Sequence, residues 1–226
     1  MKLHLDADTL LTTTRAVRKR LDFERPLDLD VVRECLEIAL QAPSGSNAQG
    51  WRFVLVTDEA KRQALGEIYR RAFALYRDMP VSAHALAGQR EGDEHAQMER
   101  VISSAEYLAA NMGRAPALLI PCVEGRADAV TGEIANLAQA SLYGSILPAT
   151  WSFMLAARER GLGTSWTTLH LMFEREAAEL LGIPYERVTQ VAMSPVAYTR
   201  GTEFKPALRR PLDGVLHLDG WPAAGS

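Results

Sequence analysis

Apolar side chains recur at spacings of three and four over residues 31–42, which is the period of an amphipathic helix. Asp28 or Asp30 can cap its start, and Pro43 ends it. A second helix is expected after Asp58. A long, mostly apolar helical pattern covers 133–160, and a helix that is apolar on most sides is expected to lie centrally. Gly144 and Pro148 interrupt this pattern and predict a kink or a restart.

Three short runs rich in apolar, aromatic or β-branched residues predict strands. They cover Trp51 to Val56, Ala117 to Val123, and Arg187 to Ala197. The tail from Tyr198 onward is expected to be extended and irregular. No linker or internal repeat divides the chain, which predicts a single domain over residues 1–226.

Residues 66 to about 112 have strong helical propensity but no clean apolar face. Aromatic residues alternate there with a charged stretch from Gln89 to Arg100. Such a segment is either a surface excursion or a lid over a binding site, and both interpretations remain open.

The composition is that of an ordinary globular protein, with 226 residues, 47% hydrophobic and 23% charged. The net charge of −3 gives no overall attraction to nucleic acid or to an anionic membrane, so neither partner is expected. The longest apolar run, 115–123, is about half of the ~20 residues needed to cross a bilayer. The two cysteines, Cys35 and Cys122, lie in apolar runs, so we expect no disulfide and a cytoplasmic location.

The common catalytic motifs are missing from the sequence. The five histidines form no HExxH pattern, and no GxSxG nucleophile elbow occurs. The Gly161-Leu-Gly163 turn follows a helix and lacks a third glycine, so a Rossmann site is not supported. We therefore expect no bound metal and no nucleophilic cysteine or serine.

Positive charge gathers in two places, each with a net charge of +3. The first cluster contains Arg15, Arg18, Lys19, Arg20 and Arg25 against Asp22 and Glu24, and the second contains Arg200, Lys205, Arg209 and Arg210 against Glu203. Arginine pairs well with phosphate oxygens, so either cluster could hold one phosphate group. Taken singly, each cluster is better explained as a solvated surface patch.

Four segments, taken in order, carry a resemblance. They are Thr14-Arg-Ala-Val-Arg18, then Ala42-Pro-Ser-Gly-Ser-Asn-Ala-Gln-Gly-Trp51, then the helix from Pro148 with its exit turn 161–164, and last Arg209-Arg-Pro-Leu-Asp213. Together they resemble the FMN-dependent nitroreductase family from about Thr14 to Val215. The chain departs from the family pattern at Thr14, Ala16, Gly50 and the pair Trp151-Ser152.

The resemblance implies an α+β fold, with a mainly antiparallel central sheet flanked by helices and an intertwined homodimer. FMN would lie at the dimer interface, and the tail, about 198–226, would embrace the partner subunit.

The resemblance also implies which residues bind the cofactor. Arg15, Arg18 and Arg209 would meet at the phosphate, which turns the two basic clusters into one site. Residues of the 44–49 loop would form hydrogen bonds with the flavin, and backbone and hydroxyl groups after the exit turn would face its ring. The full set is Thr14, Arg15, Ala16, Val17, Arg18, Ser44, Ser46, Asn47, Gln49, Trp166, Thr167, Thr168 and Arg209.

The implied activity is an NAD(P)H-dependent oxidoreductase that reduces nitroaromatics, quinones or similar electron-poor acceptors in two hydride transfers. The cofactor carries the chemistry, so no catalytic side chain is named. Arg70, Arg71 or Arg77 could favour NADPH. Two alternatives stay open: a dehalogenase or flavin-fragmenting relative of the same fold, and a flavin-storing protein without turnover.

Overall fold

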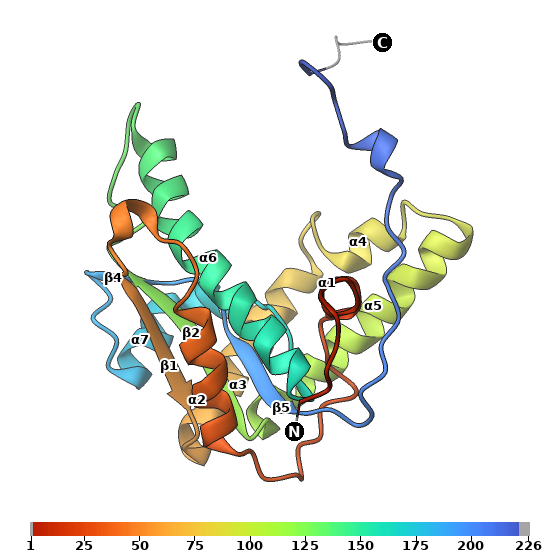
Figure 1. Cartoon of the computed structure of the whole chain (residues 1–226), viewed down its shortest axis with the longest axis horizontal. Helices are drawn as coiled ribbons and strands as arrows, with labels where there is room; N and C mark the ends of the chain where they lie inside the picture. The colour runs from red at the N-terminus through yellow and green to blue at the C-terminus, as the bar shows by residue number, and fades with distance from the viewer. Residues whose placement is uncertain (1, 222–226) are drawn as a thin grey trace.

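The computed structural model describes residues 2–221, which form a five-stranded sheet covered by helices on both faces (Figure 1). The main strand order is β1-β2-β5-β3, with β4 also paired to β2, and every pairing between these strands is antiparallel. The strands are β1 (Trp51–Val56), β2 (Ala117–Glu124), β3 (Leu162–Thr164), β4 (Val188–Gln190) and β5 (Ser194–Tyr198). The antiparallel sheet flanked by helices is therefore confirmed.

Strand β2 divides the core into two parts because successive side chains of a strand point to opposite faces. Leu118 and Ile120 pack in one apolar cluster, while Leu119 packs in another with Phe153. The first cluster lies under α3 (Glu59–Arg77), α5 (Gly92–Asn111) and α7 (Glu174–Leu181). The second lies under α2 (Leu29–Ala39) and α6 (Ala135–Glu159).

Local sequence signals fix several element ends. The Asp28 carboxylate accepts a hydrogen bond from Asp30 N at 3.0 Å, and the Asp58 carboxylate accepts one from Lys61 N at 2.9 Å. Both caps satisfy backbone donors that the first helical turn leaves free. The short helix α1 (Ala7–Thr13) is capped in the same way by Asp6. The predicted helix starts and the strand β1 are confirmed.

The long helix differs from expectation in two respects. It does not restart at Gly144 or Pro148, because α6 runs unbroken from Ala135 to Glu159. Its C-terminal part is buried against the sheet, with Ile146 and Phe153 fully covered, and this packing outweighs the hydrogen bond that Pro148 removes. The N-terminal part is not central, since Leu137 is 68% exposed.

The last predicted strand is two strands. Between β4 and β5 the ladder with β2 is interrupted: Val191 N still donates to Pro121 O of β2 at 3.0 Å, but Met193 N donates to Thr167 O at 2.8 Å. Periodicity could not show this break because every residue from 188 to 197 is buried, polar ones included.

Residues 66–112 form most of α3, the short helix α4 (Ala83–Ala87) and α5, joined to β2 by a 3-10 turn, Met112–Arg114. The expectation of no core face is wrong for α3, which buries Leu65, Ile68, Tyr69, Ala72 and Phe73 in the core. The charged stretch lies on α5, where only Ile102, Leu108 and Ala109 are buried.

Two parts of the chain expose large apolar side chains. In Figure 1 the N-terminal end of α6 projects from the body, and the tail after β5 runs away from it. The exposed apolar residues in these regions include Ile134, Leu137, Leu147 and Trp151, and, on the tail, Leu208, Leu212, Val215, Leu216, Leu218 and Trp221. The tail is largely irregular, as expected, with one 3-10 turn at Leu212–Gly214.

Both cysteines are buried free thiols, and burial raises the pKa of Cys35 to about 11. None of the helices within residues 2–221 is long and apolar enough to cross a membrane.

Candidate functional site

The N-terminal basic segment is held against strand β3. Val17 N donates to Thr164 O at 2.8 Å, and Ala16 pairs with Thr164 in a parallel bridge. Val17 is buried by this contact, whereas Arg15 and Arg18 on either side of it are only half-buried. The backbone therefore presents both arginines at the surface beside β3.

A cationic hollow of about 490 Å³ lies at this segment. Arg15 Nη1 donates to the carbonyl oxygen of Lys205 at 3.1 Å, Arg18 Nη1 donates to Ser104 Oγ at 3.2 Å, and Lys19 Nζ donates to Ser103 Oγ at 2.7 Å. Within residues 2–221 these cations form no ion pair with a carboxylate. The hollow is lined by Arg15, Ala16, Val17, Arg18, Lys19, Arg20, Ser104, Glu203, Phe204 and Lys205.

The charge of this hollow suits an anion. Five cationic side chains face one acidic residue, Glu203, and the arginines donate only to carbonyl and hydroxyl oxygens. A phosphate monoester offers the charge and the acceptor oxygens that these donors lack. The donor set therefore fits the phosphate of a flavin mononucleotide.

A second hollow of about 240 Å³ shares Arg18 with the first. Burial raises the pKa of Tyr69 to about 12, with Arg18 opposing the shift, and burial lowers the pKa of Arg18. The hollow combines aromatic walls with hydroxyl groups, which suits a flat ring system. It is lined by Arg18, Tyr69, Phe73, Tyr76, Ala83, His84, Val101, Ile102, Ala105, Trp166, Thr167, Thr168 and Leu169.

The turn after β3 supplies one wall of the second hollow. Thr167 is buried and its hydroxyl donates to Met193 O, whereas Thr168 is exposed and Trp166 is half-buried. The structure thus brings Trp166, Thr167 and Thr168 to the same hollow as Arg18. Thr14 ends α1, and its hydroxyl donates to Leu10 O at 2.6 Å.

The 44–49 loop lies elsewhere, against the projecting part of α6. Gly45 N donates to Ser145 Oγ at 2.9 Å, and Trp51 Nε1 donates to Ser145 O at 2.9 Å. The loop is shaped internally: Ser44 Oγ accepts from Gln49 N at 3.1 Å, and Asn47 Oδ1 accepts from Gln49 Nε2 at 3.0 Å.

The loop's backbone is unusual, because Ser46, Asn47 and Gln49 all have positive φ angles near 50°. Residues 44–49 line neither hollow at Arg18. Within a single chain, the loop therefore lies apart from the predicted cofactor residues at the two hollows.

Arg209 is also apart from Arg15. It lines a further hollow between the tail and α5, together with Arg90, Glu94 and Arg210. The residue of the C-terminal cluster that meets Arg15 within the chain is Lys205.

Sequence reasoning did not assign Tyr69, Phe73, Tyr76 and His84 to the site. The first three follow a spacing of four and three residues, which places them on one face of α3. The spacing of these aromatic residues could have indicated a shared helix face. It is hard to recognise in the sequence because residues 66–112 as a whole have no continuous apolar face.

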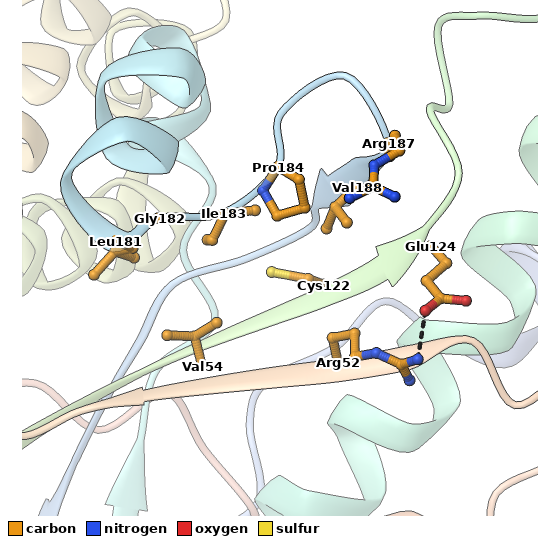
Figure 2. A pocket seen from close by; sticks show the side chains of 10 residues that line it. All are labelled: Arg52, Val54, Cys122, Glu124, Leu181, Gly182, Ile183, Pro184, Arg187 and Val188. Carbon is orange, nitrogen blue, oxygen red and sulfur yellow. Dashed lines mark hydrogen bonds and ion pairs between the residues drawn. The ribbon is translucent and has the colours of Figure 1, made fainter.

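Another hollow, of about 570 Å³, contains none of the predicted site residues (Figure 2). Val54, Cys122 and Ile183 form apolar walls, and Arg52 is paired with Glu124 at one end. Burial raises the pKa of Cys122 to about 12, so its thiol is not a ready nucleophile. Residues 2–221 contain no group of three histidine, cysteine, aspartate or glutamate residues placed to hold a metal ion.

Comparison with known proteins decides the family. The sequence profile of the Nitroreductase family matches residues 11–198. The chain belongs to the Nitroreductase family. This match covers β1 to β5 and the segment Arg15 to Arg18, and it ends where the tail begins.

Two curated relatives have different activities. A 4-nitrobenzoate reductase of Nocardioides sp. is 28% identical over 200 residues, which is 83% of this chain and 78% of that enzyme. A 5,6-dimethylbenzimidazole synthase of Rhodospirillum rubrum is 31% identical over 150 residues, 64% of this chain. The match spans 61% of the length of that synthase.

Solved structures share the nitroreductase fold. An FMN- and NADPH-dependent nitroreductase from Sphigopyxis sp. strain HMH has a TM-score of 0.67 at 22% identity, covering 96% of this chain and 100% of that one. An iodotyrosine deiodinase bound to FMN and 3-iodo-L-tyrosine has a TM-score of 0.66 at 20% identity, covering 95% and 99%. The nitroreductase fold predicted from the motifs is confirmed.

Proposed function

We propose that this nitroreductase-family protein is an FMN-dependent oxidoreductase that accepts hydride from NAD(P)H and reduces electron-poor acceptors such as nitroaromatics or quinones. The observation that carries the proposal is the pair of hollows joined at Arg18. One has five cationic side chains without carboxylate partners, and the other has aromatic walls beside Thr167 and Thr168. The family match and the similarity to a 4-nitrobenzoate reductase support it.

The side chains at the two hollows have distinct tasks in this proposal. Arg15, Arg18 and Lys205 hold the phosphate by charge-assisted hydrogen bonds, while Thr167 and Thr168 orient the flavin ring. Tyr69 and Phe73 provide an apolar surface that excludes water from a bound aromatic acceptor. When bound, FMN supplies a ring that takes up a hydride and gives it away.

The proposed working unit is a homodimer with the site shared between two chains. The 44–49 loop lies on the projecting part of α6 and lines neither hollow of its own chain, so its contribution would come to the partner's site. The exposed apolar residues of α6 and of the tail are available to bury on association. We also propose a cytoplasmic location, as the sequence predicts.

We propose either NADPH or NADH as the electron donor, and a preference for NADPH would require a basic residue at the mouth of the site. Of the three arginines named from sequence, Arg71 makes a two-point ion pair with Glu176 and Arg70 pairs with Glu67. Arg77 ends α3 and is exposed, so it is the better candidate for a second phosphate group.

The test is anaerobic reduction of the purified protein. A yellow protein that bleaches on addition of NADPH or NADH, and recovers its colour with duroquinone or nitrobenzene, supports the proposal. A protein that is free of flavin and cannot be reconstituted with FMN contradicts it. Bound FMN that neither nicotinamide reduces would instead indicate a flavin-storing protein.

A flavin-fragmenting activity is the second candidate, because of the similarity to a 5,6-dimethylbenzimidazole synthase. Incubating the reduced protein with oxygen separates the two. An oxidoreductase returns intact FMN, whereas a flavin-fragmenting enzyme yields a new aromatic product that chromatography detects. 3-Iodotyrosine turnover in the same assay tests dehalogenation.

A further inference from the structure

Helices α4 and α5 bring a histidine and a carboxylate together at the second hollow. His84 Nε2 lies 3.2 Å from Glu106 Oε1. His84 lines the hollow that also contains Thr167 and Thr168, and its ring meets the Phe73 ring edge-on, with 6.4 Å between centroids and 72° between planes. An ion-pairing carboxylate on one nitrogen holds the ring in a defined orientation.

The other ring nitrogen of His84 is unused. Nδ1 is buried and has no hydrogen-bond partner among residues 2–221. A buried polar atom without a partner costs free energy, and this cost is recovered when a ligand supplies one. His84 therefore lines the hollow with one nitrogen held by the protein and the other, Nδ1, without a partner.

His84 is the only imidazole among the described residues that line the hollow. Around His84, α3 contributes the phenols of Tyr69 and Tyr76, the segment before α2 contributes the guanidinium of Arg18, and α5 contributes the carboxylate of Glu106. The Tyr76 hydroxyl already accepts a hydrogen bond from Ala83 N at 2.8 Å, which ties α4 to α3. His84 is therefore the group suited to move a proton there.

Reduction of either acceptor class consumes a proton in addition to the hydride. A quinone takes the hydride on one oxygen and a proton on the other, which gives the hydroquinone. A nitro group takes the hydride and one proton, its N–O bond breaks, and the nitroso compound and water leave. Hydride uptake from NAD(P)H by the oxidised cofactor does not require that proton.

We propose that His84 donates this proton to the acceptor and that Glu106 is its positioning residue. The proposal rests on the proposed oxidoreductase function and adds a proton donor to a site for which the sequence named none. The imidazolium becomes neutral when Nδ1 gives its proton, while Nε2 keeps its proton in the hydrogen bond with Glu106. Nδ1 takes up a new proton from solvent that enters the hollow after the product leaves. General acids of this kind typically contribute a factor of roughly a hundred or more to the rate.

The experiment measures the two half-reactions separately by stopped-flow absorbance over pH 5.5–8.5, with NADPH as donor and duroquinone as acceptor. The holoenzyme is compared with His84→Gln, Glu106→Gln and, as a matched control, His95→Gln. His95 bonds Ala87 O through Nδ1 and lies outside the hollow. Glutamine keeps a polar side chain of similar reach but cannot shuttle a proton.

We expect reoxidation by duroquinone to fall at least tenfold in His84→Gln at pH 6, with loss of its pH dependence, while flavin reduction changes by less than about twofold. Glu106→Gln should slow reoxidation and move its pH midpoint, and His95→Gln should behave like the wild type. An unchanged pH profile of reoxidation in His84→Gln overturns the proposal.

A second readout needs no turnover. Nitrobenzene added to the oxidised holoenzyme should shift the imidazole ¹⁵N signals that His84→Gln removes, and should leave those of His95 in place. Absent shifts at saturating nitrobenzene contradict the contact. If neither nicotinamide reduces the wild type, the proposed function fails, yet dithionite-reduced protein still tests the reoxidation step and hence His84.

Discussion

Arg15 donates to the carbonyl oxygen of Lys205 across 3.1 Å, joining two basic segments that are 190 residues apart in the chain. The two clusters also meet at Arg20, which donates to the carbonyl oxygens of Arg200 and Glu203 at 3.0 and 2.8 Å, whereas Arg209 lines a separate hollow. Phe204, next to Lys205, packs against the Arg20 guanidinium at 4.1 Å and so fixes the start of the tail at the same place. The same contacts therefore position both the cationic hollow and the start of the tail.

If Arg15 and Lys205 hold the phosphate, removing either charge should weaken FMN binding. Arg15→Gln and Lys205→Gln should each weaken FMN binding by about tenfold or more, since a charge-assisted hydrogen bond contributes about 1.5–3 kcal/mol. Arg52→Gln is the control, because Arg52 pairs with Glu124 at a separate hollow. FMN affinity is measured by quenching of free-flavin fluorescence.

Arg209→Gln tests whether Arg209 lies apart from the phosphate, as in the single chain, or binds it, as the family motif implies. It should leave FMN affinity near that of the wild type, because Arg209 lies beside Arg90 and Glu94. A loss as large as that of Arg15→Gln would instead place Arg209 at the phosphate, as the resemblance implies.

Stability should depend on pH through His170. Burial lowers the pKa of His170 from 6.5 to about 4, with the Gln190 side chain partly opposing it. The unfolded chain therefore binds a proton between pH 6.5 and pH 4 that the folded protein refuses, so stability falls as pH decreases through this window. This group should account for about 2 kcal/mol of lost unfolding free energy between pH 7.5 and pH 5.

Urea unfolding of wild type and His170→Gln at the two pH values checks this. The variant should lose that part of the pH dependence, whereas His95→Gln, on the surface of α5, should retain it. Equal slopes in wild type and His170→Gln would show that other groups control acid stability.

Gly163 should not tolerate a side chain. A Cβ there would stand 2.8 Å from Thr199, 2.9 Å from Leu21 and 3.0 Å from Val17, which carries the Arg15 to Arg18 segment. Gly163→Ala should destabilise the protein by about 2 kcal/mol and weaken FMN binding by displacing that segment. Gly88→Ala, whose new Cβ would meet only Ala85 O at 3.6 Å, should change stability by less than about 1 kcal/mol.

Association of two subunits should depend on the projecting part of α6. Leu137 is 68% exposed, and Leu137→Lys places a charge on the surface proposed to be buried in the dimer. We expect light scattering to show monomers and FMN affinity to fall with dimer dissociation. Leu75→Lys, at a 51% exposed position of α3, should remain dimeric. A monomeric wild type that binds FMN tightly would remove the need for a shared site.

Local signals in the sequence determined the helix caps at Asp28 and Asp58, the strand Trp51–Val56 and the turn at Gly161. Each depends on residues a few positions apart, so periodicity and capping chemistry are sufficient to predict it. The motifs also predicted the fold, since their order along the chain is characteristic of the family.

Only the tertiary structure decided which distant residues meet. The unbroken α6 across Pro148, the meeting of Arg15 with Lys205 and the pairing of His84 with Glu106 depend on contacts between segments whose spacing carries no local signal. Burial against the sheet outweighs one lost helical hydrogen bond, and the packing of α3, α4 and α5 selects which polar side chains reach the hollow. The sequence by itself determined the elements with strong local signals and the family, and packing decided the remaining elements and the composition of the site.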